Sequence, residues 1–307
     1  MARAAAAAGW SVDVAPVSDG GEGFCAALGG RPRPARVHDP LGRPVDAAWF
    51  DLGAGVAAVE MAMASGLSVV GGPQGNDPIA ADTAGTGELI AAAVKAGARQ
   101  VLVGMGGSAT TDGGWAALQA LEPHSRLSGV DLQVACDVRT RFVAAAAVFA
   151  PQKGATPAQV LLLTRRLERL AQLYRERYAV DVELLDGSGA AGGLAGGLAA
   201  LGSTLVEGFD LVAERIELAE RLERADLVIT GEGLLDDESF NGKAVGGVVA
   251  LAREAGVPVE VIAGDAEGEH PLACRTLIDA VGAERAWADP LGALGELVAE
   301  VLAARRA

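Results

Sequence analysis

Lysine is scarce in this sequence of 307 residues, which has only three lysines among its 25 basic residues, against 40 acidic ones. The formal net charge is -15 at pH 7. A field of this sign repels phosphates, so it argues against a nucleic-acid or anionic-membrane surface. Any phosphate that the protein binds must therefore be held by local groups.

Cysteine and histidine are also scarce, with three of each. Cys25, Cys136 and Cys274 form no CxxC pair and have no histidine at ligand spacing, which indicates neither a disulfide framework nor a structural zinc site. The histidines lie outside the glycine-rich loops, which argues against a Ser-His-Asp or Cys-His arrangement there. No apolar run approaches membrane-spanning length, and the first residues lack the apolar core of a secretory signal. We therefore expect a cytoplasmic protein.

Short apolar runs rich in β-branched residues alternate with helical patterns along the chain, which indicates an α/β protein with largely parallel sheets. The length favours two domains. The first residues read as a helix that ends at Gly9, and residues 29–45, dense in Pro, Gly and Arg, predict a connection between domains. We predict strands over 12–17, 56–60, 101–103, 132–138, 227–230 and 257–263, and helices over 87–96, 115–121, 157–178 and 211–223.

One loop, in VLVGMGGSATTDGGWAALQAL (101–121), joins a predicted strand to a predicted helix. Its GMGGSA formally matches the GxGxxG/A dinucleotide fingerprint, and the rest of the loop adds hydroxyls and a carboxylate. Backbone N–H groups at the helix start suit an anion, while Asp112 or a hydroxyl meets a metal. The alternative is a tight strand-helix turn with Asp112 as the N-cap. The candidate cofactor-binding residues here are Gly106, Gly107, Ser108, Thr110 and Asp112.

Similar loops recur near the ends of other predicted strands or at the starts of predicted helices. Each alone fits ordinary turn chemistry, but together several match the edge at which open α/β sheets bind ligands. SDGGEG and TAGTGEL supply candidate substrate-binding residues, and GSGAAGGL supplies further cofactor-binding ones: Asp19, Gly20, Gly21, Glu22, Thr86 and Glu88, and then Gly189, Gly192 and Gly193.

Two of the three lysines, Lys153 and Lys243, sit beside glycines in such loops, whereas Lys95 lies on a predicted helix and reads as a surface residue. A compact charge on a flexible stem suits contact with phosphate. Phosphoryl transfer also needs magnesium and a carboxylate near the attacking hydroxyl. The candidate catalytic residues are Asp137, Lys153, Glu232, Asp236 and Lys243, of which Asp137, Glu232 and Asp236 are also candidate magnesium ligands.

The order of these motifs resembles that of the bacterial glycerate kinase family over most of residues 15–265: SDGGEG, DPLGRPV, EMAMASGL, TAGTGELI, GMGGSATTDGG, ACDV, PQKGAT, GSGAAGGL and ITGEGLLDDESFNGK. The resemblance implies a two-domain α/β kinase with its active cleft between a Rossmann-like three-layer domain and an inserted central α/β domain. It implies ATP and Mg2+ as cofactors and glycerate as acceptor, usually at the 2-hydroxyl. We expect residues 1–36 and 222–307 to form the first domain, and residues 37–221 the second.

The chain departs from the family pattern in several places. Family members typically begin with a strand and an APDSFKGS-type loop, whereas this chain starts at what would be the following helix. The stretch EPHSRLSGVDLQ is shorter than the family's loop, RTRFVAAAAVFA replaces an NPL-type turn, and ITGEGRID appears as ITGEGLLD.

Three hypotheses follow from these residues. The leading one is a kinase acting on glycerate or a related hydroxy acid. A second is a non-catalytic or truncated paralogue, which the missing strand supports. A third is an NAD(P)-dependent oxidoreductase that uses GMGGSA as its fingerprint, although Asp137 comes later than the usual ribose-binding acid.

Overall fold

The computed structural model describes residues 1–236, 239, 244–268 and 273–306. The chain divides into two compact units: unit 1 is Met1–Pro16 with Ala213–Ala307, and unit 2 is Val17–Val212. Unit 1 therefore combines both ends of the chain. The division falls at other positions than the sequence suggested, because residues 17–36 lie in unit 2 and residues 213–221 in unit 1.

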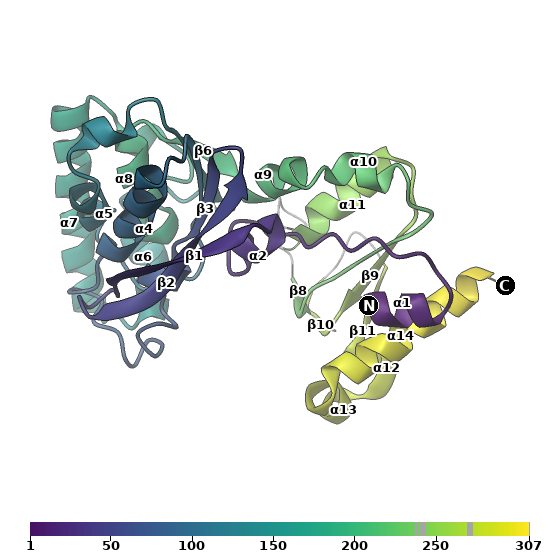
Figure 1. Cartoon of the computed structure of the whole chain (residues 1–307). Helices are drawn as coiled ribbons and strands as arrows, with labels where there is room; N and C mark the ends of the chain where they lie inside the picture. The colour runs from purple at the N-terminus through teal and green to yellow at the C-terminus, as the bar shows by residue number, and fades with distance from the viewer. Residues whose placement is uncertain (237–238, 240–243, 269–272, 307) are drawn as a thin grey trace. The chain divides into compact units, whose positions relative to one another are not determined.

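Unit 2 is built on a sheet of six described strands in the order β1-β2-β3-β4-β5-β6 (Figure 1). The first three strands pair antiparallel, and the pairs from β3 to β6 are parallel. The carboxyl ends of β3, β4, β5 and β6 thus share one edge, where ligands bind in open α/β sheets. The strands are β1 (Arg31–His38), β2 (Pro44–Gly53), β3 (Val56–Glu60), β4 (Gln100–Gly104), β5 (Asp131–Cys136) and β6 (Thr204–Glu207).

Helices cover both faces of this sheet. In Figure 1, α4 to α8 lie on one side of the sheet and α2 on the other. The long helix α7 starts with a capping box between Thr156 and Gln159. The helices are α2 (Phe24–Leu28), α3 (Ala62–Ser65), α4 (Ala84–Lys95), α5 (Trp115–Ala120), α6 (Ala144–Phe149), α7 (Pro157–Tyr178), α8 (Leu194–Ala200) and α9 (Gly208–Arg215), with 3-10 turns η1 (His124–Leu127), η2 (Pro151–Lys153), η3 (Val182–Leu184) and η4 (Ala190–Gly193).

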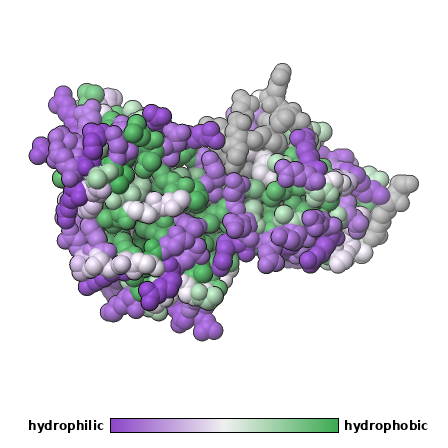
Figure 2. Space-filling model, turned by 90° about the horizontal axis from the view of Figure 1, so that it is seen from above, coloured by the Kyte–Doolittle hydropathy of each residue, from purple (hydrophilic) through white to green (hydrophobic). Residues whose placement is uncertain are grey.

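The core of unit 2 lies between the sheet and the helices of one face. Val103 of β4, Leu89 of α4 and Leu167 of α7 are fully buried in this core, while Leu102 is fully buried on the other face of the strand. Parallel strands buried on both faces explain why β4 reads as a continuous apolar run. On the face of unit 2 seen in Figure 2, hydrophilic side chains surround a central area of apolar ones.

The Pro-rich segment 29–45 is not a connection between domains, as the sequence had suggested, but a β-hairpin. β1 is an edge strand that pairs along its whole length with β2. Pro32 and Pro34 are tolerated in a strand because an edge strand has backbone positions that need no donor. At the turn, Asp39 accepts hydrogen bonds from the backbone of Leu41 and Arg43 and from the Arg43 guanidinium.

Unit 1 is a smaller three-layer fold. Its parallel sheet has the order β11-β9-β7 among the described residues, and a short parallel pair joins β10 to β8. Ile262 of β9 belongs to the core of α1 and α14, whereas its neighbours Val261 and Ala263 belong to the core of α11. Since alternate strand residues face opposite sides, helices cover both faces. The elements are α1 (Ala2–Ala7), α10 (Leu218–Leu222), β7 (Val228–Thr230), β8 (Leu234–Leu235), α11 (Ala244–Glu254), β9 (Val259–Ala263), β10 (Asp265–Ala266), β11 (Cys274–Thr276), α12 (Leu277–Val281), α13 (Ala283–Ala288) and α14 (Pro290–Arg306).

Most of the predicted elements are confirmed, and two are wrong. Residues 12–17 form no strand, because the segment is held by Arg221, whose guanidinium binds the Asp13 carboxylate and the Val14 carbonyl. The predicted helix over 211–223 is two helices, α9 and α10, which are separated where Glu217 has a φ of 53°. Within the described part of the chain, no helix has the length and apolar character needed to span a bilayer.

Candidate functional site

A pocket of about 340 Å³ lies in unit 2 beyond the carboxyl ends of β4 and β5. Its size falls at the lower end of small-molecule sites. Three segments converge there: the loop after β4, the turn η2 and the turn η4. The lining residues are Leu67, Met105, Gly106, Gly107, Ser108, Asp137, Val138, Phe149, Gln152, Lys153, Ala190 and Ala191.

Lys153 is the buried cation of this pocket, with only 3% of its surface exposed. Its Nζ donates to Ser108 Oγ at 2.6 Å and to the Thr110 carbonyl at 2.7 Å. Burial lowers the pKa of Lys153 to about 7, although the nearby Asp112 carboxylate opposes this shift. A lysine with this pKa titrates near neutrality, so its charge responds to an anionic ligand.

The loop after β4 is shaped by close backbone approach. A Cβ at Gly106 would lie 2.3 Å from Gly21 Cα, and Gly107 has a φ of 69°. The Gly107 carbonyl accepts from Leu67 N at 2.8 Å, which fixes the loop against the end of α3. Glycine is therefore needed here for fit, and the same contacts place Ser108 beside Lys153.

The second glycine-rich turn, η4, packs directly on the first loop. Ala191, Gly192 and Gly193 have φ values of 53°, 67° and 92°, and a Cβ at Gly192 would lie 1.9 Å from the Thr110 carbonyl oxygen. Gly189 likewise packs against the Arg141 carbonyl. Gly189, Gly192 and Gly193 thus shape the wall that Ala190 and Ala191 present to the pocket.

Thr110 contributes to the site through its backbone. Its carbonyl holds Lys153, whereas its hydroxyl is buried and has no hydrogen-bond partner among the described residues. The hydroxyls of Thr111, in the loop after β4, and of Ser188, just before η4, are also buried without a hydrogen-bond partner among the described residues.

Asp112 is engaged within the fold at the start of α5, as the helix-start alternative expected, and its ligand role stays a prediction. The carboxylate is buried and accepts hydrogen bonds from Thr83 N and Oγ1, Gly114 N and Ala116 N. Gly114 is the N-cap of α5, so Asp112 binds N–H groups at that helix start from two residues upstream. Burial raises the pKa of the Asp112 carboxyl, and these hydrogen bonds oppose the shift.

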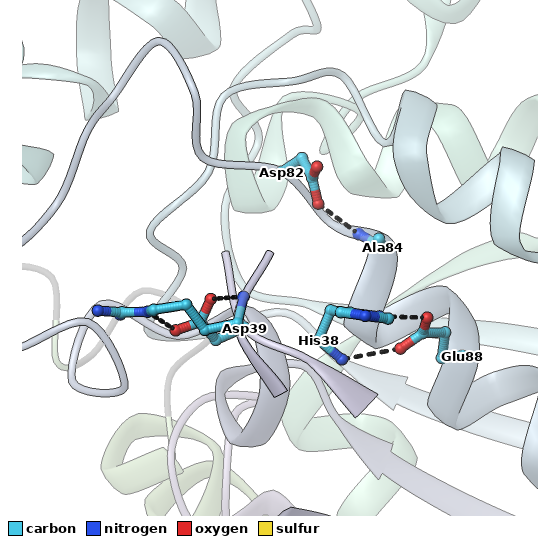
Figure 3. A network of polar contacts seen from close by, with 6 residues as sticks. His38, Asp39, Asp82, Ala84 and Glu88 are labelled. Carbon is cyan, nitrogen blue, oxygen red and sulfur yellow. Dashed lines mark hydrogen bonds and ion pairs between the residues drawn. The ribbon is translucent and has the colours of Figure 1, made fainter. Parts of the chain in front are cut away.

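Thr86 and Glu88, which the sequence suggested as substrate-binding residues, are also engaged within the fold. Thr86 is buried in α4 and donates to Ser65 Oγ at 2.7 Å. Figure 3 shows Glu88 turned toward His38, whose backbone N and ring Nδ1 lie 2.8 and 2.7 Å from the carboxylate. Both residues join α4 to other elements of unit 2, and neither lines the pocket.

The SDGGEG segment lies next to the pocket without lining it. Asp19 accepts from Gly21 N within its own turn, Gly20 packs on the Ala135 carbonyl, and Glu22 is exposed. The sequence reasoning missed Glu60, a buried carboxylate that accepts from Gly23 N and Cys25 N at the start of α2. A carboxylate at the end of an otherwise apolar strand was the available signal.

The three candidate magnesium ligands belong to different units. Asp137 lines the pocket of unit 2, whereas Glu232 and Asp236 follow β7 in unit 1. Asp236 accepts from Ser239 N and Oγ within a turn, and Glu232 is exposed. Among the described residues, no group of three or more His, Cys, Asp or Glu side chains is arranged to hold a metal ion. Lys243 lies outside the described residues.

The buried thiols do not supply a nucleophile. Burial raises the pKa of Cys25 to about 12 and that of Cys136 to about 11. Both are therefore protonated at neutral pH, and a thiol attacks far less readily than a thiolate. The chemistry that this site can perform consists of binding an anion beside Lys153 and placing a carboxylate, Asp137, near it.

The sequence and the structure of this chain are similar to those of known glycerate kinases. A model of the glycerate kinase family matches residues 1–124 and 122–284. The chain is 38% identical over 303 residues to glycerate 2-kinase of Escherichia coli strain K12, covering 87% of this chain and 79% of that protein. It is 37% identical over 324 residues to glycerate kinase of Bacillus subtilis strain 168, covering 94% and 85%. A solved structure assigned to a glycerate kinase 2 from Salmonella typhimurium LT2 matches with a TM-score of 0.77 and 36% identity, over 95% of this chain and 89% of that one. The chain therefore belongs to the glycerate kinase family.

Proposed function

We propose that this protein phosphorylates glycerate with ATP as donor, at the 2-hydroxyl, and that the pocket of unit 2 holds the acceptor. The observation that carries the proposal is the buried Lys153 in a pocket of about 340 Å³ that Asp137 also lines. In a chain with a net charge of -15, a buried cation in a pocket is a specific arrangement for an anion. The family and the names of the relatives support glycerate as that anion.

Lys153 serves as the charge that binds the acceptor. Its two hydrogen-bond partners among the described residues, Ser108 Oγ and the Thr110 carbonyl, are uncharged, so neither of them neutralises the charge of the ammonium. A carboxylate or phosphoryl oxygen that enters the pocket supplies the opposite charge. Binding of the anion then raises the pKa of Lys153 and keeps the side chain protonated.

Asp137 supplies the carboxylate that phosphoryl transfer requires near the attacking hydroxyl. It follows β5 and lines the pocket together with Lys153. In this position it orients the acceptor hydroxyl and can take its proton. Magnesium usually binds through one or two carboxylates and the substrate phosphates, so Asp137 also fits as the residue of this pocket that would hold the ion, which would neutralise charge on the phosphate oxygens.

A direct test measures ADP release with ATP, magnesium and glycerate, and identifies the product as 2- or 3-phosphoglycerate by 31P NMR. We expect glycerate-dependent ADP release and the 2-phosphate.

In Lys153→Met, kcat/KM for glycerate should fall by about 10²-fold or more, because a buried charge that stabilises the reacting groups is removed. Lys95→Met is the matched control, since Lys95 is exposed on α4; its activity should equal that of the wild type.

Two outcomes would contradict the proposal. One is absence of glycerate-dependent ADP release in protein whose circular dichroism and cooperative melting show that it is folded. The other is a folded Lys153→Met variant with unchanged kcat/KM. Melting curves with ATP and magnesium, or with NAD, separate the kinase from the oxidoreductase hypothesis, because only a ligand that binds the folded state raises Tm.

A further inference from the structure

A second and larger cavity, of about 710 Å³, lies entirely within unit 1. It opens beyond the carboxyl ends of β7 and β9, because its lining includes Gly231 and Glu232 after β7 and Gly264 after β9. This is the edge at which open parallel sheets bind ligands. The acceptor site proposed above shares no residue with it.

The walls of this cavity are apolar and include an aromatic ring. Ile262, Leu277 and Leu294 line it, together with Trp287 and Leu291 at the ends of α13 and α14. Trp287 is 79% exposed and Leu291 is 71% exposed, which is unusual for side chains of this size. Exposed apolar side chains that border a cavity mark a binding surface, and a tryptophan ring suits the face of a flat ligand.

The polar groups of the cavity select against a phosphate chain. Its charged side chains are the carboxylates Glu232, Asp265 and Glu267, and no lysine or arginine side chain is among the described lining residues. The three carboxylates disfavour an anionic group next to them, and they can accept hydrogen bonds from amino and hydroxyl donors. The lining thus fits an uncharged, flat ligand with hydrogen-bond donors at its edge.

The floor of the cavity is preformed by backbone contacts. Gly264 N donates to the Glu232 carbonyl, and Asp265 N donates to the Gly233 carbonyl, both at 3.1 Å. A Cβ at Gly231 would lie 1.6 Å from the Ile262 carbonyl oxygen, so only glycine allows this approach. At Gly233 a Cβ would meet nothing within 4 Å, which leaves open space above the backbone.

We propose that this cavity binds the purine nucleoside part of ATP, with the base against Trp287 and the carboxylates accepting from its amino group or from the ribose hydroxyls. The inference rests on the proposed function, because ATP as donor supplies the nucleoside. It assigns the base to unit 1 and the acceptor to unit 2. The apolar wall, the aromatic ring and the exclusion of phosphate together favour the nucleoside over the rest of the nucleotide.

The test measures adenosine binding by calorimetry in the full chain, with adenosine as the probe because it lacks phosphate. Trp287→Ala should raise the Kd of adenosine by roughly 5- to 100-fold, the effect of removing an aromatic platform from a base. Trp287→Phe should restore most of the affinity. Leu184→Ala is the matched control, since Leu184 is 71% exposed in unit 2 and outside both cavities. Lys153→Met should leave the Kd of adenosine unchanged.

The outcomes separate this inference from the proposed function. Adenosine binding that depends on Trp287, in a protein that does not phosphorylate glycerate, supports the nucleoside site and overturns the acceptor. The nucleoside site is overturned if the protein phosphorylates glycerate but Trp287→Ala changes neither the Kd for adenosine nor the KM for ATP. A concentration-dependent dimer that Trp287→Ala abolishes, without adenosine binding, also overturns it, because the surface would then serve a second copy.

Discussion

At the residue scale, the choice of lysine at position 153 is informative. Arginine supplies 22 of the 25 basic residues, so lysine is not the default cation of this chain. A buried ammonium is compact and can lose its proton, whereas a guanidinium stays charged and needs a planar set of acceptors. The two uncharged partners of Lys153 leave room for a ligand to complete its coordination.

The lowered pKa of Lys153 predicts a pH-dependent stability. In the folded state its pKa is about 7, against an ordinary value of 10.5. Between these values the unfolded chain binds more protons than the folded one, so this residue makes stability rise with pH, by at most about 1.4 kcal/mol per pH unit. The free energy of unfolding of the wild type minus that of Lys153→Met should therefore increase from pH 7 to pH 10, as measured by urea denaturation at several pH values.

The control for this experiment is Lys95→Met, whose stability difference from the wild type should stay nearly constant across the same range because Lys95 is exposed. Below pH 7 the difference for Lys153→Met should also become constant, since both folded and unfolded states then carry the proton. If the free energy of unfolding of the wild type minus that of Lys153→Met falls as the pH rises, the pKa of Lys153 is not lowered in the folded state.

At the scale of the elements, glycine determines how closely the loops of the site approach. Gly192 combines a φ of 67° with a position where a Cβ would lie 1.9 Å from the Thr110 carbonyl oxygen. Gly202, just after α8, has a φ of 93° but nothing within 4 Å of a Cβ. The two glycines therefore separate the cost of backbone conformation from the cost of contact.

We predict that Gly202→Ala destabilises unit 2 by about 1 kcal/mol, because alanine is strained at positive φ. Gly192→Ala should cost about 2–4 kcal/mol, since overpacking against the Thr110 backbone adds to the same strain. Thermal melting of both variants checks this order. Of the two substitutions, only Gly192→Ala should also lower the affinity for glycerate, because the loop that it shifts carries the Thr110 carbonyl, a partner of Lys153. Equal destabilisation of the two variants would show that contact is not the reason for glycine at 192.

The sequence predicted these elements unevenly, for physical reasons. The long helix Pro157–Tyr178 and the parallel strands can be predicted from the sequence, because a capping box and continuous apolar runs are local signals. The hairpin at 31–53 was missed because prolines read as a break, although an edge strand tolerates them. Lys153 was singled out because lysine is rare, whereas the hydrogen bonds of Asp112 with Thr83 and of Glu88 with His38 could not be predicted, because these partners are distant in sequence.

At the scale of the whole molecule, the division into units could not be placed from composition. The chain after residue 17 belongs to unit 2, where the Gly20 carbonyl accepts from Gly106 N and the Glu60 carboxylate accepts from Gly23 N and Cys25 N. The boundary after Val212 falls inside α9, where no proline or glycine marks it. Neither boundary is therefore marked by a local signal in the sequence.

The assignment of the two ligands to different units predicts separate patterns of hydrogen exchange. Glycerate should slow exchange in the loops that form the pocket of unit 2, over residues 104–112, 149–153 and 187–193. Adenosine should slow it around the cavity of unit 1, over residues 231–236, 262–268 and 286–294. The reason is that a ligand protects the amides whose opening would disrupt its site.

Mass spectrometry of the full chain with each ligand alone measures this, with Lys153→Met and Trp287→Ala as the controls that should each lose one pattern and retain the other. Protection of the unit 2 loops by adenosine, or of the unit 1 segments by glycerate, would reverse the assignment of donor and acceptor.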